Sequence, residues 1–139
     1  MECKSDFNTL FQFVIYDDDR KSKIIKVSKV TTDKKESFNL IDIRVYYKFD
    51  EECRPSTLYG VSMTPKEFKE IWPKVSVGEI CTVIREDRND RKTISFKPIG
   101  ARTHKLSVQK LDEKEKFVYI STSEIEKIRG VAQQIFAHI

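Results

Sequence analysis

Basic and aromatic side chains gather in one stretch of the chain, a combination suited to binding a polyanion that also carries flat rings. Between positions 20 and 35 the sequence holds seven Lys or Arg residues against one acid, Asp33. Arg44, Tyr46 and Tyr47 follow shortly afterwards. Single-stranded nucleic acid needs cations for its phosphates and aromatic faces for its bases, and each stacked base contributes about 1–3 kcal/mol. A basic strand by itself is equally consistent with a solvated face of a sheet.

The overall charge permits a nucleic-acid partner without requiring one. The 139 residues include 26 Lys or Arg against 22 Asp or Glu, a formal net charge of +4. A mildly basic balance of this kind favours polyanions in general and selects no particular one. No apolar run approaches the length of a membrane-spanning helix, so we expect no membrane partner.

Other kinds of chemistry find little support in the sequence. The chain has no glycine-rich phosphate loop, no HExxH and no GxSxG motif. Its three cysteines form no CxxC pair and its two histidines lie far apart, which argues against a structural zinc site and a disulfide framework. We therefore expect no enzymatic activity, no metal and no cofactor.

The elements that would position these side chains are mostly strands. Apolar and polar residues alternate repeatedly; from Leu40 to Tyr47, for example, Ile41, Ile43 and Val45 form one face. Such period-2 alternation predicts strands with one covered and one open face. The expected strands are Leu10 to Ile15, Lys23 to Val30, Leu40 to Tyr47, Leu58 to Met63, Ile80 to Ile84, one through Ile94 and Phe96, Lys105 to Leu111 and Phe117 to Ile120.

Two helix starts are clear. Thr64 and Ser121 each precede a glutamate by three residues, which is the pattern of a capping box. Pro73 predicts that the first helix stops or kinks near Trp72. The second helix carries a wide apolar stripe that must be buried against another part of the protein.

The chain contains an internal similarity. The segments 14–27 and 83–96 match without a gap at an offset of 69, and the segments 61–68 and 118–125 match at an offset of 57. Two matches in the same order predict a tandem duplication of a strand-rich unit that ends in a helix. We expect units at residues 1–77 and 78–139, joined through their two helices in a chain that is a monomer.

One region also resembles a known family. The string Leu-Ile-Asp-Ile-Arg at residues 40–44, then Arg54-Pro55, then the segment Gly60 to Phe68 resembles the transcriptional coactivator positive cofactor four. The resemblance covers about residues 10–75. It implies an α+β fold of two tandem units, each a curved four-stranded antiparallel sheet followed by a helix, packed as an intramolecular pseudo-dimer through the helices.

The resemblance also implies where nucleic acid would bind. The family's sheet arginine maps onto Arg44, its stacking tryptophan onto Tyr47 and its loop cation onto Arg54. Periodicity instead places Tyr46 on the face of Arg44, and both tyrosines are kept as candidates. The candidate nucleic-acid-binding residues are Lys23, Lys26, Lys29, Arg44, Tyr46, Tyr47, Arg54, Tyr59, Lys97 and Lys105.

Two functions are consistent with these features. The first is a nuclear single-stranded DNA-binding protein with little sequence preference, acting as a transcriptional coactivator or in DNA maintenance on single-stranded or melted DNA. The second is a protein-interaction module that binds transcription factors or RNA polymerase components and has lost most nucleic-acid binding. Gln109 and Asp112, which stand where Arg44 and Tyr47 stand in the first half, favour the second function somewhat.

Overall fold

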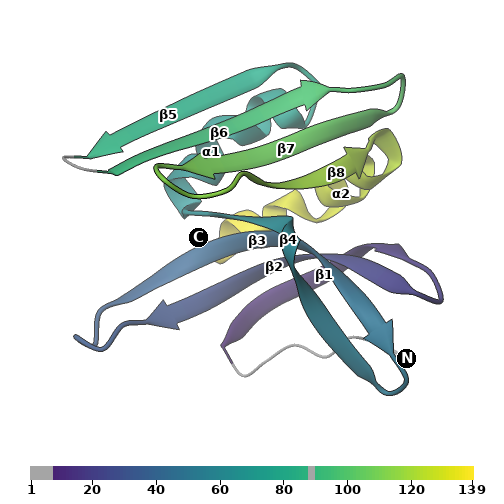
Figure 1. The fold of residues 1–139 in the computed structure, drawn as a ribbon, viewed down its shortest axis with the longest axis horizontal. Coiled ribbons are helices and arrows are strands. Elements are labelled where there is room, and N and C mark those ends of the chain that lie inside the picture. The colour runs from purple at the N-terminus through teal and green to yellow at the C-terminus, as the bar shows by residue number, and fades with distance from the viewer. Residues whose placement is uncertain (1–7, 88–89) are drawn as a thin grey trace.

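The computed structural model describes residues 8–87 and 90–139. Four strands and a helix are followed by four more strands and a second helix (Figure 1). The elements are β1 (Thr9–Asp17), β2 (Lys21–Thr31), β3 (Ser37–Phe49), β4 (Glu52–Met63), α1 (Pro65–Val75), β5 (Cys81–Asp87), β6 (Asp90–Pro98), β7 (Thr103–Lys110), β8 (Lys116–Ser121) and α2 (Thr122–Ala137).

All eight strands belong to one mixed sheet, in the order β1-β2-β3-β4-β8-β7-β6-β5. Neighbouring strands are antiparallel except β4 and β8, which are parallel and paired at Tyr59 and Phe117. The prediction of two tandem units, each with a four-stranded sheet and a helix of its own, was therefore wrong. Alternation identifies the buried face of a strand but carries no information about which distant strand lies beside it.

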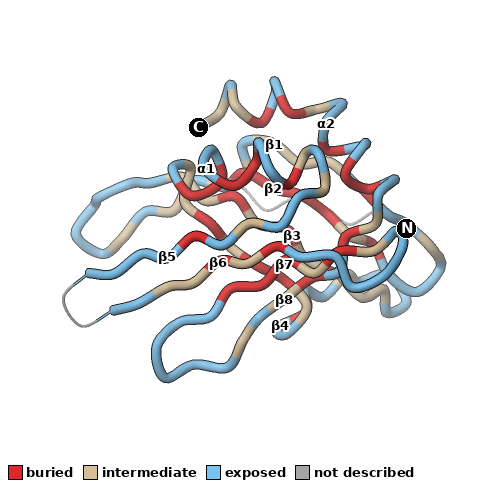
Figure 2. The backbone as a smooth tube through the Cα atoms, turned by 90° about the horizontal axis from the view of Figure 1, so that it is seen from above, coloured by how far each residue is buried: buried red, intermediate tan, exposed pale blue. Residues whose placement is uncertain are grey.

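The helices also pack differently from the expectation, which was that they pack mainly against each other. The main neighbours of α1 are β5 and β3, and those of α2 are β1 and β8. The helices touch each other through Phe68 and Phe136, whose ring centroids are 5.8 Å apart. Figure 2 shows both helices on the same side of the strands. The division expected after residue 77 falls in the connection between α1 and β5 and stays a prediction.

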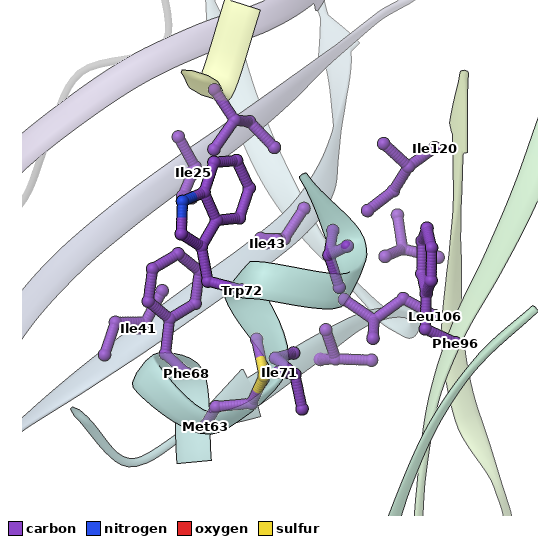
Figure 3. Close-up of a cluster of buried hydrophobic side chains, with 14 of the residues drawn as sticks. Ile25, Ile41, Ile43, Met63, Phe68, Ile71, Trp72, Phe96, Leu106 and Ile120 are labelled. Atoms are coloured by element: carbon purple, nitrogen blue, oxygen red, sulfur yellow. The ribbon is translucent and has the colours of Figure 1, made fainter. Parts of the chain in front are cut away.

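One cluster of buried side chains runs beneath both helices. Figure 3 shows Phe68 and Trp72 of α1 on the side of Ile25, Ile41 and Ile43, with strand residues of the later part of the chain on its other side. These buried side chains remove the covered face of the sheet from water, which is the main driving force for the fold. On the opposite face of β2, Ser22, Ile24 and Lys26 are buried as well, so the expectation of one fully open face does not hold there.

The predicted starts of both helices are confirmed, and the end of the first helix differs from its prediction. Thr64 and Ser121 both form complete capping boxes, as predicted. Helix α1 continues through Pro73 to Val75, so it does not stop near Trp72, which was one of the two outcomes expected of Pro73. Proline removes one backbone donor, but Trp72 and Val75 are buried in the core, which offsets that loss.

Two further features bear on the expectations from sequence. No helix in the described residues is long and apolar enough to span a membrane. Cys81 is a free thiol, and partial burial raises its pKa. Cys53 is disulfide-bonded, although the number and spacing of the cysteines argued against a disulfide framework.

Candidate nucleic-acid interface

Strand β3 carries its predicted site residues on both faces of the sheet. The register between β2 and β3 runs without a break from the pair Lys21 and Tyr47 onwards, so alternation along β3 is unbroken. The irregularity near Arg44 lies on β4, which has extra residues there. Tyr46 therefore shares a face with Arg44, as periodicity predicts, and Tyr47 lies on the other face with Val45. Arg44 and Tyr47 do not line the same hollow.

Arg44 is engaged within the protein. Its Nε and Nη2 atoms donate to the two carboxylate oxygens of Asp42 at 3.1 and 2.9 Å, and its Nη1 donates to the carbonyl of Ser56 at 2.5 Å. The side chain is only 17% exposed. A two-point arginine–carboxylate contact of this kind fixes the guanidinium in place. Arg44 therefore orders the irregular part of β4 whether or not it also meets a ligand.

Gly60 makes room for this arginine, and its substitution should show it. A Cβ atom on Gly60 would lie 2.6 Å from Cζ of Arg44 and 2.7 Å from its Cγ. We expect Gly60→Ala to destabilise the protein by about 1–3 kcal/mol, the usual cost of overpacking. Gly130→Ala is the control, because its Cβ would meet nothing within 4 Å in helix α2 and should stabilise by up to about 1 kcal/mol. Urea unfolding measures both, and equal effects would contradict the role of Gly60.

Lys23 connects distant parts of the chain. Its Nζ donates to Oε1 of Glu124 at 2.7 Å and to the carbonyl of Tyr119 at 2.6 Å. Glu124 is also the capping-box glutamate that accepts from the backbone N–H of Ser121. Lys23 was predicted to contact nucleic acid, but its charge is already paired in the folded protein.

An equivalent link joins β6 to the other helix start. Lys92 Nζ donates to Oε1 of Glu67 at 2.9 Å and to the carbonyl of Ser62 at 3.2 Å, and Arg85 lies 3.4 Å from Glu67. Burial by itself would raise the pKa of Glu67, which is 1% exposed. The hydrogen bonds from Lys92 and from the Thr64 backbone outweigh burial and hold the pKa below its ordinary value.

Lys26 and Tyr46 form an internal contact on the face of β2 and β3 that lies opposite Ile25 and Ile43. The Nζ of Lys26 lies 5.0 Å from the centroid of the Tyr46 ring, which is cation–π distance. Lys26 is 8% exposed, although it was expected to point into solvent. Asp42 is its partner in the register of the two strands. This lysine is consequently a poor candidate for a phosphate contact.

The remaining predicted cations lie on different parts of the sheet, apart from the neighbours Lys97 and Lys105. Lys29 is exposed on β2, near the hairpin that joins β2 to β3. Arg54 is exposed on β4, with Glu52 at 3.1 Å. Lys97 faces Lys105 across β6 and β7, and Lys105 lies 3.2 Å from Glu115 and 4.5 Å from the ring of Phe117. These four cations do not form one site.

The structure instead gathers tyrosines in a hollow beside the β4–β8 pairing. This hollow, which we call the tyrosine groove, has a volume of about 300 Å³. It is lined by residues from four strands: Lys21, Lys23, Val45, Tyr47, Tyr59 and Tyr119. A neighbouring hollow of about 270 Å³ shares three of these residues and adds Tyr16, Ser22 and Glu124.

The rings of the tyrosine groove are held by their neighbours. Tyr59 packs edge-on against Phe117 with ring centroids 5.4 Å apart, and Phe117 packs in the same way against Tyr119 at 5.2 Å. The hydroxyl of Tyr16 donates to Asp18 at 2.6 Å, and this bond, together with the backbone N–H groups of Arg20 and Lys21, lowers the pKa of Asp18 to about 2. Edge-on packing leaves ring surface available for a further flat partner.

Two lining residues were missed from the sequence. Tyr119 is 43% exposed and belongs to the open face of β8, opposite Val118 and Ile120. That alternation was visible in the sequence and could have identified it. Lys21 is exposed and forms no ion pair with any carboxylate in the described ranges. Nothing in the sequence distinguishes Lys21 from the other lysines nearby, and it is identified as a groove residue only by its place in the structure.

A third hollow has a different lining, which comes from β3, β4, β7, β8 and the residues between β7 and β8. We call it the lysine groove; its volume is about 110 Å³. Its lining residues are Arg44, Val61, Ser62, Val108, Lys110, Glu113, Lys114 and Lys116. None of them is aromatic, and cations predominate.

Neither a comparison with known proteins nor a search for metal-binding side chains assigns a role to these hollows. No protein-family model matches the chain, and no curated protein matches it. Across residues 8–87 and 90–139, no three His, Cys, Asp or Glu side chains are grouped as a metal ion would require. The features that bear on function are therefore the two grooves and the resemblance of residues 10–75 to the positive cofactor four family.

Proposed function

We propose that the protein binds single-stranded nucleic acid, with DNA as the expected form, and that bases stack in the tyrosine groove. The observation that carries this proposal is the gathering of Tyr47, Tyr59 and Tyr119 from three separate strands around one hollow beside Lys21. Aromatic rings next to cations are the combination that binds unpaired strands.

The groove favours unpaired bases for a geometric reason. A ring can stack on a tyrosine only when its own face is accessible, and in a duplex both faces of each base are covered by stacking on the neighbouring base pairs. The lining consists of tyrosines, lysines and one valine, and it contains no Asn, Gln, Asp or Glu, the side chains that read adenine or cytosine edges. Every base has a π-face, so binding by stacking tolerates any sequence.

The cellular role follows from the resemblance to the positive cofactor four family. We propose that the protein acts in the nucleus as a transcriptional coactivator or in DNA maintenance. Support comes from the Leu-Ile-Asp-Ile-Arg string and the segment from Gly60 to Phe68. The placement of Arg44 in an internal ion pair departs from the role that the resemblance implies for it.

Salt titration tests the proposal. We expect fluorescence anisotropy to show binding of a labelled oligo-dT strand at low salt, with log K falling linearly against log salt at about −0.7 per phosphate contact. A duplex of the same length should bind more weakly. If oligo-dT gives no anisotropy change at low salt, the proposal fails.

Exposed apolar residues support a second candidate function, that of a protein-interaction module. Val77 and Ile80 in the connection from α1 to β5 are 65% and 68% exposed, and Ile84 on the edge strand β5 is 51% exposed. Neighbouring exposed apolar side chains are typical of interaction surfaces. Absence of single-stranded DNA binding, together with binding of a transcription factor that Ile80→Ser weakens, would favour this function.

A further inference from the structure

The two grooves share strands β3, β4 and β8 and have different chemistry. Strand β4 contributes Tyr59 to the tyrosine groove and Val61 to the lysine groove. Strand β8 contributes Tyr119 to the first and Lys116 to the second. At about 3.3 Å per residue, these positions are separated by roughly 7–10 Å along each strand. The grooves are therefore close enough for one extended ligand to reach both.

The cations of the lysine groove are largely uncompensated. Lys110, Lys114 and Lys116 are exposed, and none of them forms an ion pair with a carboxylate among the residues that the structure describes. Glu113 is the acid in the lining. Arg44 is neutralised by its ion pair with Asp42, so the three exposed lysines face one carboxylate, that of Glu113. Clustered cations in a recess attract anions by focusing the electric field.

The walls of this groove exclude recognition of bases by stacking. Val61 and Val108 are buried at its base. The hydroxyl of Ser62 donates to Asp42 at 2.6 Å. The lining contains no ring on which a base could stack. The chemistry that fits is a phosphate group, because lysine binds phosphate as a mobile point charge.

We propose that the lysine groove binds the phosphodiester backbone of a nucleic-acid strand without contacting its bases. The identity of the strand rests on the proposed function, in which the bases of the same ligand stack in the tyrosine groove. Binding in the tyrosine groove then depends on the bases of the strand, and binding in the lysine groove depends on its charge alone.

An oligomer without bases separates the two contributions. The probes are a labelled dT strand and an abasic strand of equal length. The test variant is Lys110→Gln/Lys114→Gln/Lys116→Gln, and the charge-matched control is Lys34→Gln/Lys35→Gln/Lys66→Gln, whose lysines are exposed and outside both grooves. We expect the test variant to bind the abasic strand at least about 10-fold more weakly and to lose about 2 from the salt slope, at about 0.7 per charge.

Each outcome decides between the two proposals. If the control lowers abasic binding as much as the test variant does, or if the test variant leaves it unchanged, the lysine groove is not a phosphate site. If the test variant abolishes abasic binding but wild type binds dT no better than the abasic strand, the phosphate site stands and the stacking proposal fails. If wild type binds neither strand at low salt, both proposals are overturned.

Discussion

Lys92→Met is expected to destabilise the fold by about 3 kcal/mol. Removing one member of a buried ion pair usually costs roughly 3–5 kcal/mol, because the other charge is left without its partner. Glu67 is 1% exposed and would keep only Arg85 at 3.4 Å and the cap N–H, so the lower end of that range applies. At roughly 3 °C per kcal/mol for a chain of this size, Tm should fall by about 10 °C.

Two comparisons isolate the buried pair from a general effect of lost charge. Lys74→Met removes an exposed ion pair with Glu79, whose side chains are 55% and 58% exposed, and should cost less than about 1 kcal/mol. The double variant Lys92→Met/Glu67→Gln removes the stranded charge and should recover part of the loss. If Lys92→Met costs no more than Lys74→Met in thermal unfolding, the link is not important for stability.

Tyr47→Ala/Tyr119→Ala is expected to weaken oligo-dT binding on the order of 30-fold or more. Each stacked base contributes about 1–3 kcal/mol, and every 1.4 kcal/mol is tenfold in Kd, so losing two rings removes at least about 2 kcal/mol. Both residues line the tyrosine groove. Fluorescence anisotropy at fixed salt measures the change, and Tyr47→Phe/Tyr119→Phe should keep near wild-type affinity because the rings remain.

The neighbouring tyrosine provides a matched control on the same strand. Tyr46 lies on the opposite face of β3 and covers Lys26. Tyr46→Ala should therefore leave DNA affinity near wild type while lowering stability. Equal loss of affinity in Tyr46→Ala and in Tyr47→Ala would mean that the tyrosine groove is not the binding surface. Melting curves of each variant show whether a loss of affinity merely reflects unfolding.

Lys23 illustrates how a basic residue can mislead a binding study. It lines the tyrosine groove and also holds the capping glutamate of α2. A substitution at Lys23 would weaken binding through loss of structure as well as through loss of a phosphate contact. Lys21 is the better probe of charge in this groove, because it is exposed and unpaired with any described carboxylate.

The buried face of β3 and both helix starts followed from the sequence alone. Ile41, Ile43 and Val45 are buried as their alternation predicts, and both capping boxes form. These features are local, because side-chain alternation and a cap hydrogen bond depend on residues within a few positions of one another. The order of Tyr46 and Tyr47 on the two faces of β3 follows from the same periodicity.

Only the tertiary structure decided which strands are neighbours and which charges are available. The single sheet depends on a parallel pairing between Tyr59 and Phe117, and the loss of Lys23 as a free cation depends on Glu124, 101 residues away. The tyrosine groove likewise combines residues 21 and 119. Such contacts arise when the chain closes long loops to bury one common core, and no local pattern in the sequence encodes the partners.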